Sequence, residues 1–350
     1  MSAEKRDHSI DILKGIAIIL VLVGHIPYTP HILRAWLYTF HVPTFFVCSG
    51  ILLSVDRYPK FKDFFISRVK GLLLPILTLG ILSALLQVAL CWAFNTFSHG
   101  IVSYTTDIHP LSLLLSLLIG YRVHEYYFTL WFLYTLFLGE LIFYFLVKLI
   151  RKRWYGYLII LLCGIALQYV ISSHVCGFVW SIDLLPACLA FLSCGALLKM
   201  LIYEKGKKVP VWILPIAIVL SFVFTYLNMP GGDQVNLFYG QMWNPVFYLI
   251  SALSGIMICV IISRLIGRSR PLEFYGRNSL VTYAFQSPLA IVLMMGLLDL
   301  LAAFDPVFDD LTFRWIVTIT GALLFLALLD WLISRFAPWF IGKKKGGRAK

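Results

Sequence analysis

Long apolar runs alternate with short polar segments along almost the whole chain. Because a helix needs about 20 mostly apolar residues to cross a bilayer, each long run predicts one membrane-spanning helix. The predicted spans are residues 10–27, 37–54, 72–94, 128–150, 156–173, 183–203, 211–228, 245–266, 279–301 and 313–337. The run at 111–120 is too short to span and predicts an interfacial or re-entrant piece. The pattern therefore predicts an all-α fold, a polytopic helical bundle of about ten spans.

The basic residues fall almost entirely in alternate polar segments. With the N-terminus placed in the cytoplasm, Arg34, Arg122 and Arg314 lie outside, Lys14 lies within the first span, and the rest of the 29 Lys and Arg residues lie in cytoplasmic segments. Because positively charged loops stay in the cytoplasm, both termini are expected there, in a multi-pass protein of the plasma or inner cell membrane. Membrane topology then explains the net charge of +12. Membrane lipids are the expected surroundings, and no nucleic-acid partner is needed.

Composition argues against a separate soluble domain. The chain is 60% hydrophobic and 13% charged, whereas soluble domains are about 45–50% apolar and about 25% charged. Residues 1–350 are therefore expected to form a single transmembrane domain, with 342–350 as a basic cytoplasmic tail. The seven cysteines are scattered through apolar runs without a CxxC spacing, so they are interpreted as small hydrophobic residues and no metal site is predicted.

Among the ionisable side chains of the first span, Lys14 and His25 stand eleven residues apart. This spacing puts them roughly 16 Å apart along a helix, on nearly one face. Ionisable groups are costly inside a bilayer and usually mark a pathway or a site. Lys14 is expected near the cytoplasmic side, and His25 near the outer side together with His41, which opens the second span. A neutral imidazole can take a proton from a hydroxyl and return it, so both histidines are candidate catalytic residues. The alternative is that each makes only an interhelical hydrogen bond.

Several further charged residues are candidates for binding an anion, and each also has a purely structural interpretation. Asp11 and Lys14 are spaced for an ion pair on one helix face, or Lys14 faces a phosphate. Arg68 and Lys70 precede the third span, where they either anchor the helix at the interface or bind a polyanion from the cytoplasm. Arg277 stands beside a predicted helix N-terminus, which also suits an anion.

Other polar or amphipathic side chains lie within the spans or at their ends. Ser49, Trp131 and Glu140 are the candidates among them for contact with a substrate or with the reacting atoms. Glu140 is among the costliest to leave unpaired inside a membrane. Each of these residues is more often structural than catalytic, and the sequence leaves both interpretations open.

In this order and spacing, these residues resemble the membrane-embedded acyltransferase-3 family. The resemblance rests on Asp11-Ile-Leu-Lys14-Gly through Gly24-His25, Phe40-His41-Val-Pro43 with Ser49-Gly50, Arg68 to Pro75, Leu130-Trp131-Phe132-Leu133, and Gly276-Arg277-Asn278-Ser279-Leu280. The family pattern has a basic residue, ten residues and then the essential histidine, and Lys14 and His25 match it. The chain departs from the pattern at Gly71, where the family has a second arginine, and at Gln286, where many members have a histidine.

The resemblance implies transfer of an acyl group, most often acetyl, from acetyl-CoA or another acyl-CoA to a hydroxyl of an extracytoplasmic or lipid-linked glycan. It implies that a basic set holds the donor and that His25 is the general base, with His41 and Trp131 as further catalytic residues. Donor-binding candidates are Lys14, Arg68, Lys70 and Arg277, and substrate-binding candidates are Asp11, Ser49 and Glu140. No metal is expected, and the chain is compatible with a homodimer.

A transporter or flippase for a lipid-linked glycan is the competing function class. Ten spans with charges inside the membrane would serve it as well. Such transporters often show repeated halves with broken helices, and no internal repeat is apparent here. A purely structural or sensory membrane protein would leave Lys14 and His25 unexplained.

Overall fold

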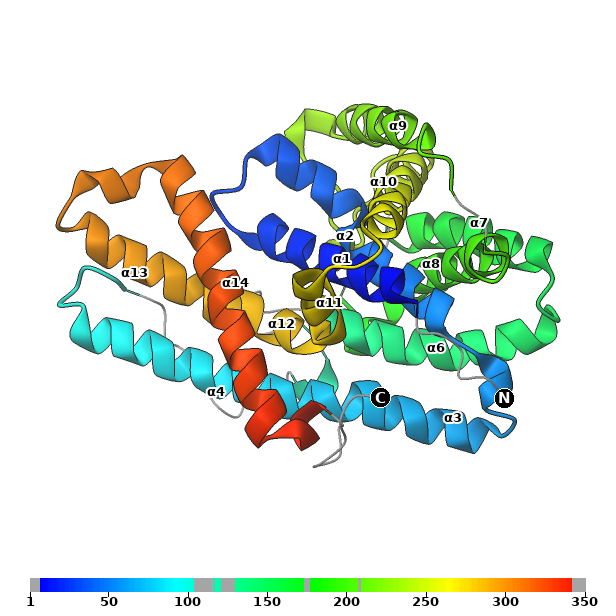
Figure 1. Ribbon diagram of the computed structural model, residues 1–350, viewed down its shortest axis with the longest axis horizontal. Helices are drawn as coiled ribbons and strands as arrows, with labels where there is room; N and C mark the ends of the chain where they lie inside the picture. Colours follow the sequence, from blue (N-terminus) through cyan, green and yellow to red (C-terminus); the bar gives the residue numbers. More distant parts are fainter. Residues whose placement is uncertain are drawn as a thin grey trace.

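Helices make up nearly all of the regular structure in the computed structural model, which describes residues 7–103, 115, 117–120, 130–172, 177–206 and 209–341 (Figure 1). The α-helices are α1 (His8–His25), α2 (His31–Leu52), α3 (Phe61–Arg68), α4 (Leu74–Phe97), α6 (Trp131–Leu149), α7 (Trp154–Ser172), α8 (Leu185–Leu198), α9 (Ile213–Leu227), α10 (Pro245–Ile266), α11 (Arg270–Arg277), α12 (Ser279–Phe285), α13 (Val292–Ala302) and α14 (Leu311–Phe336). The turns of other helical types are η1 (Val55–Arg57), η2 (Val69–Leu73), η3 (Val179–Leu184), η4 (Lys199–Tyr203), η5 (Pro230–Gly232), η6 (Leu237–Tyr239), η7 (Gln286–Ile291), η8 (Pro306–Asp309) and η9 (Pro338–Ile341). The predicted all-α class is confirmed. The basic tail 342–350 and half of the predicted interfacial piece, residues 111–114 and 116, lie outside the described residues.

Within the described ranges, nine helical stretches are long and apolar enough to cross a membrane, one fewer than predicted. The prediction at 211–228 forms α9, which has 15 residues and is shorter than the roughly 20 that a span needs. The predicted span at 72–94 is part of a longer stretch, Phe61–Phe97, because α3 continues through the π-helical turn η2 into α4. The apolar run in the sequence is bounded by the basic residues of α3, but the helix itself continues through them.

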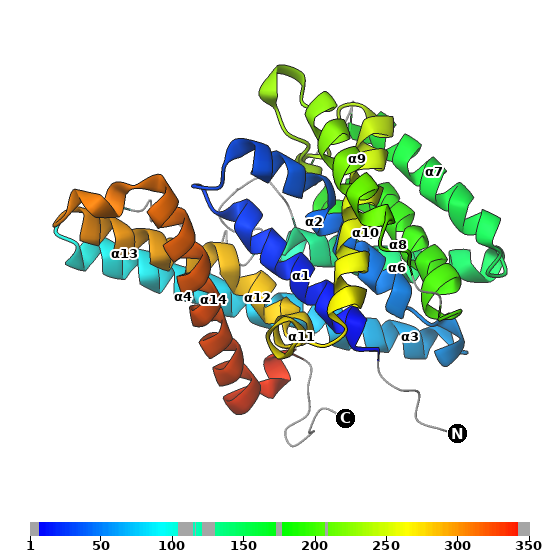
Figure 2. The same ribbon diagram turned by 45° about the horizontal axis from the view of Figure 1, so that its top comes forward.

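Helix α1 lies against α2, α10 and α11 and occupies a central position in the bundle (Figures 1 and 2). Its approach to α11 is close because both helices present glycine: a Cβ on Gly15 would collide with the Leu272 carbonyl, and one on Gly276 with the Asp11 carbonyl. Small residues allow this approach between membrane helices. The contact fixes α11, and with it Arg277, beside the first half of α1.

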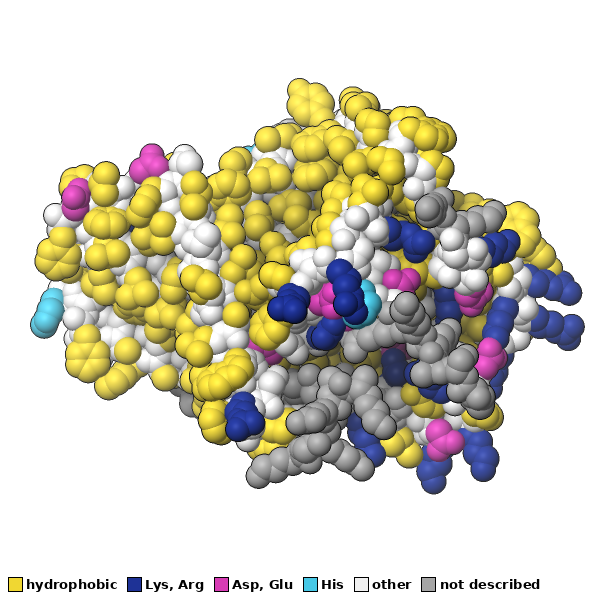
Figure 3. Space-filling view, viewed as in Figure 1, with side chains coloured by type: hydrophobic (Ala, Val, Ile, Leu, Met, Phe, Trp, Pro, Cys, Tyr) yellow, Lys and Arg dark blue, Asp and Glu magenta, His cyan; other side chains and the backbone are white. Residues whose placement is uncertain are grey.

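The two ends of the bundle differ in charge. Lys and Arg side chains gather toward one end (Figure 3), where α1 begins and where the turn between α6 and α7 carries Arg151, Lys152 and Arg153. We call this the basic end. The far end holds the turn between α1 and α2 and the loop between α13 and α14. The helix axis of α1 therefore runs from the basic end to the far end.

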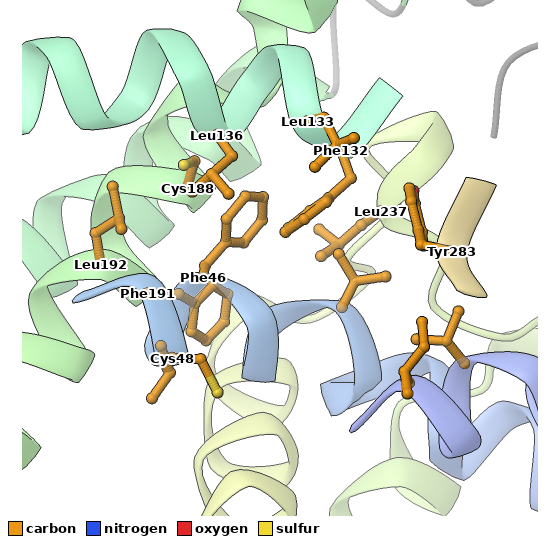
Figure 4. Packing of buried hydrophobic residues seen from close by; sticks show 14 of the residues in the cluster. Phe46, Cys48, Phe132, Leu133, Leu136, Cys188, Phe191, Leu192, Leu237 and Tyr283 are labelled. Carbon is orange, nitrogen blue, oxygen red and sulfur yellow. The ribbon is translucent and has the colours of Figure 1, made fainter. Parts of the chain in front are cut away.

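A buried aromatic cluster packs α2, α6 and α8 together in the centre (Figure 4). The Phe46 ring of α2 lies 4.7 Å from the Phe132 ring of α6, and both residues are at most 5% exposed. Phe191 of α8 is fully buried in the same cluster. This packing sets the position of the first turns of α6, which carry Trp131 and Phe132 toward α1.

Candidate functional site

A cavity of about 410 Å³ lies around His25 where α1 ends. We call it the histidine cavity. Its walls come from α1, α2, α4, α6, η6, α12, η7 and α13, so segments from the whole chain converge on it. It is lined by His25, Pro27, Tyr38, His41, Val42, Gln87, Trp131, Asn236, Leu237, Phe238, Tyr239, Tyr283, Gln286, Ser287, Pro288, Ile291, Val292 and Met295. Aromatic walls with a few polar groups are typical of small-molecule sites.

The hydrogen bond of His25 defines which of its ring nitrogens is basic. Nδ1 lies 2.8 Å from the carbonyl oxygen of Val21, one turn earlier in α1. Because a carbonyl oxygen can only accept, Nδ1 carries a proton. In the neutral ring Nε2 then keeps its lone pair. His25 is thus held in the tautomer that can take a proton through Nε2.

His41 repeats this arrangement on α2. Its Nδ1 lies 2.6 Å from the Leu37 carbonyl oxygen, and its ring centroid is 6.0 Å from that of His25, edge to face. The Tyr38 ring lies beside both, at 4.8 Å from His41 and 5.8 Å from His25. The structure therefore brings the two predicted histidines together and adds a tyrosine to them.

Trp131 enters the same cavity at the first residue of α6. Its ring lies 6.0 Å from that of Phe238, which belongs to the turn η6 between α9 and α10. The indole N–H is a donor only. The third predicted catalytic residue therefore shares a cavity with His25 and His41.

The turn that follows His25 is fixed by side chains from the far end. Thr29 donates its hydroxyl to the Val23 carbonyl at 2.6 Å and accepts a hydrogen bond from the Trp315 indole at 3.0 Å. The Arg314 guanidinium bonds Tyr28, Asp299 and Asp309. These contacts tie the end of α1 to α14 and so restrain His25.

A second cavity, of about 260 Å³, lies closer to the basic end. We call it the Lys14 cavity. It brings together Lys14 of α1, Ser49 of α2 and Arg277 of α11, which are three of the predicted site residues. Its lining is Lys14, Phe45, Cys48, Ser49, Leu52, Gly71, Leu72, Phe132, Leu133, Leu136, Arg277, Ser279, Leu280 and Tyr283.

The Lys14 cavity opens beside a network of charged groups between α1 and α11. Arg277 binds Asp11 through Nε at 3.2 Å and also pairs with Glu273. His8 Nδ1 lies 2.9 Å from the Glu273 carboxylate. This hydrogen bond is the main cause that lowers the pKa of the Glu273 carboxyl below its ordinary value. The network holds Arg277 at the wall of the cavity, and Asp11 is part of that support.

Three other predicted residues line neither cavity. Arg68, the last residue of α3, forms an ion pair with Glu140 of α6 at 2.8 Å, and Glu140 is buried. Lys70 is exposed on the π-helical turn η2, next to Gly71, which does line the Lys14 cavity. The structure therefore places Arg68 and Glu140 with each other, and Lys70 near the cavity but outside its wall.

Several lining residues were not among the sequence predictions. Tyr38 lies three residues before His41, a helical spacing that could have drawn attention to it. Tyr283 follows the Gly-Arg-Asn-Ser-Leu string by about one turn. The segment 236–239 comes from a loop between two helices, and no periodicity in the sequence marks a loop as part of a cavity.

A model of the acyltransferase domain family Acyl_transf_3 matches residues 7–335. No curated protein and no solved structure gives a match. The family match extends from the start of α1 to the end of α14, and both cavities lie within it. With its many apolar helices, the chain is a multi-pass membrane protein, and it belongs to the membrane acyltransferase-3 family.

Proposed function

We propose that this acyltransferase is an O-acetyltransferase that moves acetyl from acetyl-CoA to a hydroxyl of an extracytoplasmic or lipid-linked glycan, with His25 as general base. One observation carries the proposal. Lys14 and His25 stand on the same helix, each lines a cavity, and Tyr283 is a wall of both cavities. A cationic cavity followed by an imidazole cavity suits a donor that is anionic at one end and reactive at the other.

The donor enters from the basic end. Acyl-CoA carries several phosphate charges on its nucleotide, and the cations closest to the Lys14 cavity are Lys14 and Arg277. Lys70 and Arg68 belong to the same end of the bundle and would attract the nucleotide as it approaches. Eleven residues of helix separate Lys14 from His25, roughly 16 Å, which an extended pantetheine arm can bridge.

The reaction takes place in the histidine cavity. The acceptor oxygen attacks the thioester carbon while its proton passes to Nε2 of His25. The carbon–sulfur bond then breaks, and the CoA thiolate leaves and takes that proton back. The Trp131 indole, which can only donate, is assigned to the oxyanion. His41 is assigned to the orientation of His25.

The direction of transfer follows from the charge pattern. Positively charged segments favour the cytoplasm, so the basic end would face the cytoplasm and the histidine cavity would lie toward the outer side. In a cell membrane this arrangement passes an acyl group outward while CoA stays inside. A glycan carries the hydroxyl acceptors that such a site would meet on the outer side.

Purified protein in lipid vesicles tests the reaction with labelled acetyl-CoA. We expect CoA release that depends on His25: His25→Ala should lose on the order of 10²–10⁴ in rate. His31→Ala is the matched control, since His31 is exposed at the start of α2 and lines neither cavity. Full activity of His25→Ala would overturn the proposal. Loss of a surface acetyl mass from the glycans of cells without the protein would identify the acceptor.

Donor binding is tested separately at Lys14. Lys14→Gln should raise the apparent KM for acetyl-CoA and leave the rate at saturation largely unchanged. Cys48 gives an independent readout because it lines the Lys14 cavity: bound CoA should protect its thiol from alkylation. An unchanged KM together with unprotected Cys48 would remove the donor from this cavity.

A further inference from the structure

Two aromatic side chains stand where the histidine cavity and the Lys14 cavity meet. Tyr283 of α12 lines both, and Phe132 of α6 lines the Lys14 cavity directly after Trp131, which lines the other. Their rings lie 5.7 Å apart. Figure 4 shows both beside Leu237, a residue of the histidine cavity. The two spaces are therefore distinct cavities with an aromatic pair between them.

This pair is held firmly in place. Phe132 packs on Phe46 at 4.7 Å and on Phe45 at 5.9 Å between ring centroids. The Tyr283 ring of α12 packs edge to face on the Phe132 ring of α6, so the two helices meet at this point. Both side chains are less than 10% exposed. A ligand that extends from one cavity to the other has to displace at least one of the two rings.

We propose that Phe132 and Tyr283 form a partition that selects the acyl group by size. The proposal rests on the function proposed above, in which the donor enters from the Lys14 cavity. The acyl group is the leading end of that donor and must pass the partition before the thioester reaches His25. A two-carbon acetyl group needs a smaller ring displacement than a longer acyl chain. In the absence of donor, the closed partition separates the two cavities.

Donor selectivity tests whether the partition selects the acyl group by size. CoA release is measured with acetyl-CoA, butyryl-CoA and hexanoyl-CoA for the native chain, Phe132→Leu and Tyr283→Leu. We expect the native chain to prefer acetyl. The ratio of hexanoyl to acetyl kcat/KM should rise by about tenfold or more in either variant, within the range that a few methylenes contribute to selectivity. Tyr283→Phe, which keeps the ring and loses only the hydroxyl, should shift the ratio less.

A matched control distinguishes selection by the partition from a general effect of lost packing. Phe191→Leu removes a fully buried aromatic ring that lines neither cavity, and it should leave the ratio unchanged. An unchanged ratio in both active partition variants, or an equal change in Phe191→Leu, would overturn selection by the partition. Absence of His25-dependent release from every donor would instead overturn the proposed function.

A second measurement requires no activity. In a chain whose other cysteines are replaced by serine, Cys48 reports access to the Lys14 cavity. A membrane-impermeant maleimide added outside intact cells should label Cys48 slowly in the parent and several-fold faster in Tyr283→Leu and Phe132→Leu. The Phe191→Leu background should match the parent. Labelling that does not change in either partition variant would show that these two rings do not separate the cavities.

Discussion

The rings of His25 and His41 lie 6.0 Å apart, edge to face, and each donates Nδ1–H to the carbonyl four residues earlier in its own helix. Both imidazoles therefore keep Nε2 as the nitrogen that can accept a proton. Since both imidazoles could act as a base, their positions must decide which one takes the proton. Both line the histidine cavity, but His25 ends the helix that carries Lys14 and is partly exposed, whereas His41 is only 3% exposed.

The first prediction assigns these roles. His41→Ala should reduce kcat by about 10²-fold, the effect of misplacing a base by around 1 Å, and leave the KM for acetyl-CoA unchanged. The loss should be smaller than that of His25→Ala. The double variant should be no slower than His25→Ala alone, because residues that act as a unit do not contribute additively. Steady-state kinetics of the three variants measure this, and a further loss in the double variant would show that His41 acts independently.

The second prediction concerns the Arg68–Glu140 ion pair. Glu140→Met should destabilise the protein by about 3 kcal/mol, the lower end of the range for buried pairs, because the Arg68 side chain is 26% exposed. Arg68→Met with Glu140→Met should recover most of that loss, since no unpaired charge remains. Thermal unfolding in detergent measures both. A double variant as unstable as Glu140→Met would contradict the explanation.

The same double variant decides whether Arg68 binds the donor. If Arg68 only neutralises Glu140, the stable double variant keeps the native KM for acetyl-CoA. If Arg68 also attracts the nucleotide, that KM rises, and the rise becomes smaller at high salt because exposed charges are screened. Kinetics at two ionic strengths separate these outcomes independently of stability.

The helices could be predicted from the sequence because hydropathy alone identifies spans. The exceptions have physical causes: α9 is too short to cross, and the basic residues of α3 conceal a helix that continues into α4. The grouping of His25 with His41 and of Lys14 with Arg277 could also be predicted, because these are ionisable side chains at matching ends of the spans. The position of Ser49 in the Lys14 cavity could not, because nothing in the sequence shows which cavity a small hydroxyl faces.

The partners across helices could not be predicted in the same way. In the sequence, Arg68 and Glu140 are two charged residues 72 positions apart, and nothing there pairs them. Only the packing of α3 on α6 brings them together. Phe132 and Tyr283 are ordinary aromatic residues among the 27 Phe and 18 Tyr of the chain. Their role depends on which cavities they face, a property of tertiary packing.

The third prediction uses the lowered pKa of Glu273. Because the hydrogen bond with His8 lowers this pKa in the folded protein, the ionised carboxylate stabilises the contact of α11 with α1. That contribution is present above the ordinary pKa of 4.5 and is lost as the pH falls through the folded value. Unfolding temperatures of the native chain and of Glu273→Gln should therefore differ near neutral pH and converge only once the pH has fallen below the lowered pKa of the folded protein. A difference that persists at low pH would contradict this assignment.

The fourth prediction concerns Gly71, where the family resemblance implies an arginine. Gly71 lines the Lys14 cavity, and a Cβ added there would meet no atom within 4 Å. Gly71→Ala should leave the KM for acetyl-CoA unchanged and stabilise the helix by about 0.5–1 kcal/mol.

Gly71→Arg adds a cation at the same wall and should lower that KM by a factor of about 2–5, the effect expected of one exposed charge pair of up to about 1 kcal/mol. Gly71→Glu should raise the KM by a similar factor, and both effects should weaken in high salt. A KM that follows the size of the side chain at residue 71, with no dependence on its charge, would contradict this prediction. It would place the donor phosphates away from this wall of the Lys14 cavity.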